Sequence, residues 1–355
     1  MTPEDKQQLK AYLKGAAKIL YRNTEPTELS SFESIEKSLR QKMLEEVGSE
    51  LATFFFKTRS GIKTGRRRTV KSLIGLLNMT DNQAEYFGLK PYSQVSPMME
   101  KCALIIRANE SYQKGEKDLE TFTAIRVAHS TLQRMVKIQD FELPTSKQGV
   151  QEITLDGGKV RLRNEKKGEP CYWKDYKALC LDNVYCGAFF QNNQDFIDWS
   201  NSQKLLHPIY CIGDGDPGIW NLFQEIGGPE QRQEILDWYH LKENLYKAGG
   251  SLKRLKQAEN LLWSGQVNEV INLFKELKRK GFKTFCNYLE FHRNRIVNYR
   301  YYKEESLSSI GYGTVESTIK RIGLRVKLSG AQWNIESVSS ILSLRCAYLN
   351  GQLSA

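Results

Sequence analysis

Apolar side chains recur at helical spacing through the first 145 residues, which predicts a helical N-terminal region. In residues 32–56 one helical stripe is apolar: Leu39, Met43, Val47, Leu51 and Phe55. Two more helical patterns, residues 111–123 and 129–138, are joined by the short segment 124–127. This spacing is compatible with a helix-turn-helix over residues 111–138, although short helix pairs are more often plain structure.

The second helix of that pair would present polar side chains on one face, as DNA recognition requires. We expect it to expose Ser130, Gln133, Arg134 and Lys137 and to bury Leu132 and Val136.

From residue 150 the pattern changes to β, after a Pro- and Gly-containing linker at 144–149. Strands are predicted at 152–155, 177–181 and 185–191, followed by a helix at 195–205, a strand at 208–212, a helix at 217–226 and a strand at 234–239. Three strands, then helix, strand, helix and strand is the order typical of a ribonuclease-H-like mixed sheet, so we expect an α/β fold. A helical stretch at 241–302 would interrupt that fold.

Charge changes this picture by indicating a polyanionic partner. The 355 residues carry a net charge of +11, and residues 247–303 hold 13 Lys and Arg against 4 Glu, a net of 13 − 4 = +9. Such an excess favours a nucleic acid, although solvated helix faces can also be rich in lysine. We find neither an apolar run of 18 residues nor a signal-peptide pattern, and expect a soluble, cytoplasmic protein without membrane contact.

The seven cysteines are odd in number and form no CxxC pair. We interpret them as reduced core residues, with neither a disulfide framework nor a zinc site.

Three acidic residues are the candidates for chemistry. Asp156 follows a β-type run and precedes two glycines, where the chain could bend away; Asp214 follows a second such run 58 residues later (214 − 156); Glu316 lies where a Gly-marked loop becomes helical. Taken alone, Asp156 would more often be an Asp in a Gly turn. Three converging carboxylates, however, suit hard divalent cations and phosphodiester displacement.

The sequence around these acids resembles the Kra-type family of DDE-class transposases from bacterial insertion sequences. The shared segments are LDGGKVR at 155–161, IGDGDPGIWN at 212–221, ILDWYHLKENL at 235–245, IGYGTVES at 310–317, SGAQW at 329–333 and LSLRCA at 342–347. They cover about residues 150–350 in the family's order. RRRTVKSLIG at 66–75 looks like the family's N-terminal region, whereas its cysteine-pair zinc ribbon is missing.

The resemblance implies that Asp156, Asp214 and Glu316 are the catalytic residues and hold Mg²⁺ or Mn²⁺. It favours DNA-phosphate contacts for the cations beside them and for the N-terminal arginine triplet. These cations are Arg66, Arg67, Arg68, Lys320, Arg321, Arg325 and Lys327. It also implies an auxiliary role for Asp237 and His240 in ordering the site, whereas a lone hydrogen-bonded His is more often structural.

Two residues keep alternative interpretations. Asp216 could be an additional metal ligand, but Asp-Pro before a helical run is a standard helix start, so we favour an N-cap. Trp333 could stack on a base, but a lone Trp more often packs in a core.

The combined prediction is a DDE transposase that cleaves double-stranded DNA at the transposon ends and joins it to target DNA, as a homo-oligomer acting at the prokaryotic nucleoid. Four regions are expected: a DNA-binding region at 1–145, a ribonuclease-H-like core at 150–246, a basic helical insertion at 247–303 and the C-terminal part of the core at 304–355. The alternatives are a ribonuclease-H-like nuclease without strand transfer and a non-catalytic DNA-binding transposase remnant.

Overall fold

The computed structural model describes residues 1–60, 64–166, 168–275, 277, 279–310 and 314–353; for 57–60 and 314–319 it describes the backbone alone. The described chain divides into two compact units, unit 1 with residues 1–107 and 112–135 and unit 2 with residues 108–111 and 136–355. None of the described helices is both long and apolar enough to cross a membrane.

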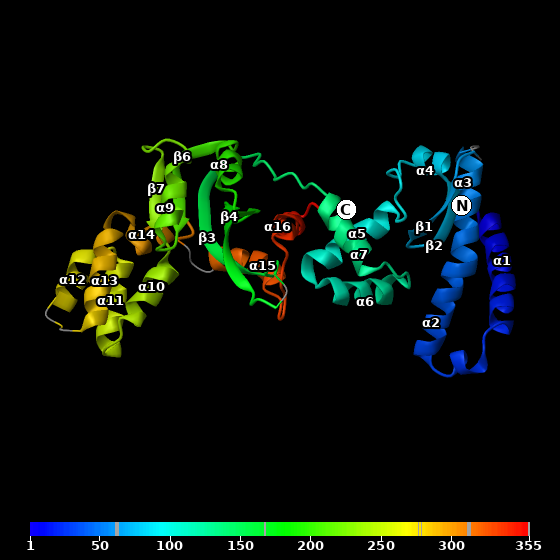
Figure 1. Ribbon diagram of the computed structural model, residues 1–355, viewed down its shortest axis with the longest axis horizontal. Helices are drawn as coiled ribbons and strands as arrows, with labels where there is room; N and C mark the ends of the chain where they lie inside the picture. Colours follow the sequence, from blue (N-terminus) through cyan, green and yellow to red (C-terminus); the bar gives the residue numbers. More distant parts are fainter. Residues whose placement is uncertain (61–63, 167, 276, 278, 311–313, 354–355) are drawn as a thin grey trace. The chain divides into compact units, whose positions relative to one another are not determined.

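Unit 1 is mostly helical, with one β-hairpin (Figure 1). Its elements are α1 (Pro3–Arg22), η1 (Pro26–Leu29), α2 (Phe32–Lys42), η2 (Met43–Gly48), α3 (Ser49–Ser60), β1 (Arg67–Ser72), β2 (Gly75–Thr80), α4 (Asp81–Tyr86), α5 (Pro97–Asn109), α6 (Tyr112–Thr123) and α7 (His129–Ile138). The predicted helix pair at 111–138 is confirmed as α6 and α7.

The hairpin β1–β2 corrects the prediction of a wholly helical N-terminal region. Val70 on β1 and Leu77 and Met79 on β2 are buried in a small cluster with Ala52 of α3. Alternate residues of each strand therefore face α3, which is the period-two pattern of a half-buried strand. The run of arginines at the start of β1 hid this alternation, and Gly75, at φ 116°, allows the tight turn.

The predicted apolar stripe of residues 32–56 is not buried as one face. Leu39, Leu51 and Phe55 are exposed, whereas Ala52 is buried. The intervening segment η2 is a π-helix, whose wider turn shifts the helical phase, so the buried position moves from 51 to 52. A sequence pattern read at constant period cannot show such a shift.

Unit 2 is built on a five-stranded mixed sheet in the order β5-β4-β3-β6-β7. The strands are β3 (Val150–Leu162), β4 (Tyr172–Leu181), β5 (Tyr185–Phe190), β6 (Leu205–Gly213) and β7 (Arg232–Leu236). β3, β4 and β5 pair antiparallel, whereas β6 and β7 run parallel to β3. This is the predicted α/β architecture with a mixed sheet.

Helices connect and cover these strands. They are α8 (Asn193–Asn201), α9 (Pro217–Gln224), α10 (Trp238–Lys247), α11 (Leu252–Trp263), α12 (Val267–Lys275), α13 (Lys280–Phe291), η3 (Arg293–Arg295), α14 (Tyr299–Glu304), α15 (Thr314–Val326) and α16 (Ile335–Leu349). α15 packs on β3 and β4, and α16 packs on β5. Leu155 of β3 points into the opposite core, which includes Ile219 and Phe223 of α9 and continues into α10–α14.

Several element boundaries differ from those predicted, and three of them have a clear cause. β3 continues to Leu162, seven residues beyond the expected end, because β4 pairs with it along that length. The helix expected at 195–205 ends at Asn201, and the chain enters β6 at Leu205. β7 ends at Leu236 because the Asp237 side chain accepts from the His240 amide and starts α10.

The buried carboxyl of Glu152 links β3 to Ser309, in the segment that precedes α15. Glu152 accepts hydrogen bonds from the Ser309 amide at 2.5 Å and the Ser309 hydroxyl at 2.6 Å, and from the Asn183 side chain at 3.2 Å. Burial raises the pKa of Glu152, while the bonds from Ser309 oppose that shift.

Because its pKa is raised in the folded state, Glu152 should make stability fall with rising pH. The native state binds the proton more tightly, so this contribution is present below the unfolded pKa and is lost as pH rises through the folded pKa. Urea unfolding of the wild type and Glu152→Gln between about pH 4 and 7 should show the wild type losing stability relative to the variant. Exposed Glu165→Gln is the control, and an equal loss in all three proteins would contradict the assignment.

Candidate functional site

Asp156 lies within β3 and not at the end of a strand, which corrects the prediction. The last residue of β3 that pairs with β6 is Leu155, opposite Gly213, whereas β4 continues alongside to Leu162. The Asp156 carboxylate is thus at the point where β3 extends beyond β6. Its oxygen accepts from the Gly157 amide at 2.6 Å, so the carboxylate is held against its own backbone.

The loop after β6 carries Asp214 between two glycines. Its oxygen accepts from the Asp216 amide at 2.8 Å. A Cβ on Gly215 would lie 2.8 Å from the Tyr288 ring of α13, and the backbone of Gly215 is hydrogen-bonded to the imidazole of His292. Glycine at position 215 therefore leaves room for the Tyr288 ring, and the side chains of Tyr288 in α13 and of His292, which follows α13, hold the loop.

The side chain of Asp216 caps the next helix, as predicted. Its Oδ1 accepts from the Gly218 amide at 2.7 Å, at the N-terminus of α9. This leaves Asp214 as the acid of the loop that faces Asp156.

Asp237 and His240 come from the first turn of α10. Asp237 is buried, and its Oδ1 interacts with both the amide and the Nδ1 of His240, at 2.9 and 3.0 Å. The backbone amide of Asp237 donates to the carbonyl of Gly213 at 2.8 Å, which joins α10 to the end of β6. His240 is thereby oriented by its own helix cap and held beside the loop of Asp214.

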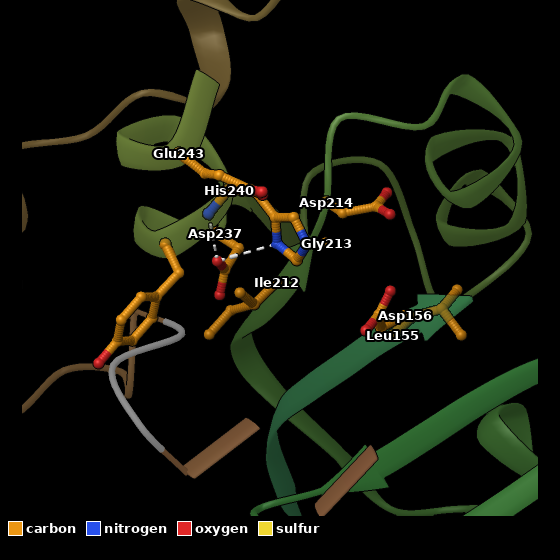
Figure 2. A pocket seen from close by; sticks show the side chains of 9 residues that line it. Leu155, Asp156, Ile212, Gly213, Asp214, Asp237, His240 and Glu243 are labelled. Atoms are coloured by element: carbon orange, nitrogen blue, oxygen red, sulfur yellow. Dashed lines mark hydrogen bonds and ion pairs between the residues drawn. The ribbon is translucent and has the colours of Figure 1, made fainter. Parts of the chain in front are cut away.

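These elements bring two carboxylates and an imidazole together. Asp156, Asp214 and His240 each offer one ligand atom within 4.8 Å of the others. Figure 2 shows the His240 ring between Asp237, to which it is bonded, and Asp214, with the Asp156 carboxylate directed into the same space from β3. The pocket has a volume of about 240 Å³ and includes Glu243, one helical turn beyond His240.

Electrostatics in this pocket favour an added cation. Burial raises the pKa of the Asp156 carboxyl, and the Asp214 charge raises it further while His240 lowers it. Burial also raises the pKa of Asp214, against the hydrogen bond from the Asp216 amide. The hydrogen bond to Asp237 raises the pKa of His240 to about 9 despite its burial, so the imidazole is cationic at neutral pH. Two half-buried carboxylates beside one imidazolium are a site that a divalent ion would stabilise.

The donor set fits hard divalent ions. Carboxylate oxygens, here from β3 and from the loop after β6, are the ligands that Mg²⁺ and Mn²⁺ prefer, whereas imidazole is more typical of Zn²⁺ and other transition metals. The bond of its Nδ1 to Asp237 and the raised pKa that results favour His240 as a neighbouring cation that orients the carboxylates. The family resemblance implied an auxiliary role for His240, and the i, i+3 spacing of Asp237 and His240 is a local signal that pairs these two side chains.

The third predicted acid, Glu316, falls in the first turn of α15, but its side chain lies outside the described residues. Of the four cations predicted around it, Lys320, Arg321 and Lys327 are exposed. Arg325 is 1% exposed, and its guanidinium lies 4.9 Å from the centroid of the Trp333 ring. A phosphate contact by Arg325 was therefore the wrong prediction, because its side chain packs in the core against Trp333.

Trp333 packs in the core, as favoured from the sequence. It is buried, and its indole nitrogen donates to the carbonyl of Val326 at 3.0 Å. The backbone of Trp333 also pairs with the end of β3, at Leu162.

The predicted DNA-contacting residues of unit 1 lie on two separate elements. On α7, Ser130 and Arg134 are exposed and Gln133 is partly exposed, whereas Leu132 and Val136 are buried as predicted. At the hairpin, Arg66 and Arg67 are exposed. The Nε of Arg68 lies 3.4 Å from Asp81, and its side chain is only 13% exposed, so this arginine is held by an ion pair.

Sequence reasoning missed Tyr176 and Gly158, which position α15. Tyr176 of β4 is buried against Gly158 of β3, and a Cβ on Gly158 would lie 2.2 Å from its ring. A Cβ on Gly323 of α15 would lie 2.8 Å from the Tyr176 hydroxyl. The ring therefore fills the space between two glycines, one beside Asp156 and one on the helix of Glu316.

Comparison with known proteins does not place the chain in a family. No protein-family model matches it, and no curated protein matches it significantly.

Proposed function

We propose that this protein is a DDE-type transposase that cleaves and joins DNA with divalent metal ions. The observation that carries the proposal is the pair of carboxylates, Asp156 and Asp214, that neighbouring parallel strands bring within 4.8 Å of each other and of His240. The strand order β5-β4-β3-β6-β7, with β4 antiparallel to β3, supports a ribonuclease-H-like assignment for the sheet. The sequence segments around the acids support the transposase family within that fold.

In this function Asp156, Asp214 and Glu316 would hold Mg²⁺ or Mn²⁺. The bound ions would supply charge compensation at the phosphodiester and lower the pKa of the attacking water. The carboxylates would bind and orient the ions, and Asp237 would hold His240 as a cation beside them. Exposed Lys320 and Arg321 on α15 are suited to the phosphates of the bound strand.

Unit 1 and the helices after β7 would divide DNA recognition. Ser130, Gln133 and Arg134 present amide, hydroxyl and guanidinium groups from a short helix, which suits base edges in a groove. Lysines such as Lys280 and Lys283 are exposed on α13 and suit phosphates without reading sequence. The protein would act on the nucleoid of a prokaryotic cell as a homo-oligomer bound to two DNA ends.

The direct test is cleavage of the protein's own flanking DNA. Duplexes that carry the sequences on either side of its gene, and scrambled duplexes, are incubated with the full chain in Mg²⁺, Mn²⁺ or EDTA, together with a target plasmid. A transposase is expected to cut the flanking duplex in Mg²⁺ or Mn²⁺ and to join it to the plasmid. Cleavage without joining would indicate the nuclease alternative, and binding without cleavage in any metal would indicate a non-catalytic DNA-binding remnant.

The proposed division of DNA recognition between α7 and α13 is tested by competition binding. The competitors are duplexes that carry the transposon-end sequence and scrambled duplexes. Replacing Gln133 and Arg134 together by Ala should reduce the preference for the end, because each lost base contact costs about 1–3 kcal/mol of discrimination. Replacing Lys280 and Lys283 by Ala should weaken both duplexes about equally and flatten the salt dependence. An unchanged preference in the Gln133, Arg134 variant would move recognition to another element, with Arg66 and Arg67 of the hairpin as the next candidates.

A further inference from the structure

An open groove adjoins the acidic pocket on the other side of Asp214. It has a volume of about 780 Å³ and is formed mainly by the part of the β3–β4 ladder that extends beyond β6. The lining residues include Asp214, Trp173 and three lysines, Lys159, Lys177 and Lys327. Because Asp214 lines both cavities, whatever occupies the groove passes beside the Asp214 carboxylate.

The groove contains an aromatic ring that the fold does not bury. All six tryptophans are among the described residues, and Trp173 is 58% exposed, whereas Trp199, Trp220, Trp238 and Trp333 are buried and Trp263 is partly buried. An exposed indole lacks the stabilisation that burial of its large apolar surface would give. This favours binding of a ligand with a flat face that can cover the ring.

The pairing register of β3 and β4 places the lysine side chains on the same face of the sheet as the Trp173 ring. Gly157 lies opposite Lys177, Lys159 opposite Asp175, and Arg161 opposite Trp173. Alternate residues of a strand share a face, so the indole and the lysine side chains line one side of the ladder. Gly157 leaves this floor without a side chain, and a Cβ there would approach only the Lys177 ammonium, at 3.9 Å.

The charge of the groove depends on metal. Its three lysines face Asp175, Asp214 and Asp216, so the lining is balanced without ions. Divalent ions at the Asp156 and Asp214 pair would leave it positive, which attracts a polyanion.

We propose that Trp173 stacks on an unpaired base of the strand whose backbone passes Asp214, with Lys159, Lys177 and Lys327 on its phosphates. The inference rests on the proposed function for the nature of that strand. A paired base inside a duplex offers only its edges, so a stacking ring needs a frayed, flipped or single-stranded base. Trp173 is five residues along β4 from Ala178, which lies opposite Asp156, a distance of about 17 Å. That corresponds to about five stacked nucleotides, or fewer in an extended strand.

The test measures binding of forked oligonucleotides to the full chain in Ca²⁺, so that its readout does not depend on cleavage. 2-Aminopurine is placed at each of the six nucleotides nearest the fork, in DNA and in RNA. We expect quenching at one register and an affinity for the fork over the duplex that falls about 5- to 150-fold in Trp173→Ala. Trp173→Phe should keep much of the preference. Tyr172→Ala is the matched control, because Tyr172 is the neighbouring exposed aromatic on the opposite face of the ladder.

The outcomes separate this inference from the proposed function. If Trp173→Ala keeps both the quenching and the preference for the fork, the inference is wrong, whether or not the protein cleaves DNA. If the preference depends on Trp173 but the wild type cleaves nothing in Mg²⁺ or Mn²⁺, the strand-binding groove stands and the transposase proposal fails. Equal effects of Trp173→Ala and Tyr172→Ala would also overturn the inference, because they would indicate a general destabilisation of the paired strands β3 and β4. The DNA and RNA arms show which strand the groove takes.

Discussion

Asp156→Asn and Asp214→Asn are each expected to lower metal-dependent DNA cleavage by on the order of 10³-fold. Each change removes the charge that holds a cation but keeps a side-chain oxygen. That oxygen can still accept from the Gly157 or Asp216 amide, so the local backbone should persist. Single-turnover cleavage in Mn²⁺ gives the rate, and calorimetric titration with Mn²⁺ gives the loss of metal binding.

The same variants should be at least as stable as the wild type without metal. Burial raises the pKa of both carboxyls, so their ionised forms are destabilised in the folded protein, and a neutral amide relieves that cost. Thermal unfolding in EDTA therefore separates lost chemistry from lost folding. Asp216→Asn is the matched control, since Asn can also cap α9 and activity should remain. Normal cleavage by Asp214→Asn with loss in Asp216→Asn would transfer the ligand role to Asp216.

Gly158→Ala is expected to destabilise the protein by about 1–3 kcal/mol, although it adds only one methyl group. The new Cβ would overlap the buried Tyr176 ring, which has Gly323 of α15 on its other side. A ring pushed away from Gly158 would press against α15, the helix that carries Glu316. We therefore expect cleavage to fall together with stability, as measured by urea unfolding and by the cleavage rate.

Gly157→Ala is the control for this change. It lies one position earlier in β3, where the nearest atom to a new Cβ is the end of the Lys177 side chain at 3.9 Å, so stability should be unchanged or slightly increased. The double variant Gly158→Ala, Tyr176→Ala should be less destabilised than the sum of its single changes, because the overlap is removed. Equal stability of the two glycine variants would show that the Tyr176 contact does not constrain Gly158.

Local patterns were sufficient to predict the order of helices and strands in the second half of the chain. The cap at Asp216 and the buried and exposed faces of α7 also followed from spacing alone, whereas the choice of Asp156 and Asp214 as site residues rested on the family resemblance. These features depend on residues within a few positions of one another, where helical and strand periods fix which side chains share a face. They therefore appear in a single sequence.

Contacts between distant segments decided the rest. Asp156 is in mid-strand because β4 continues alongside it, and Arg325 is buried because Trp333 covers it. His240 joins the acids through a bond between the Asp237 amide and the end of β6, and Glu152 binds Ser309, 157 positions away along the chain. The local spacing of apolar and polar residues cannot predict which distant segment a strand or a buried charge will contact. That contact depends on the free energy of the whole packed unit.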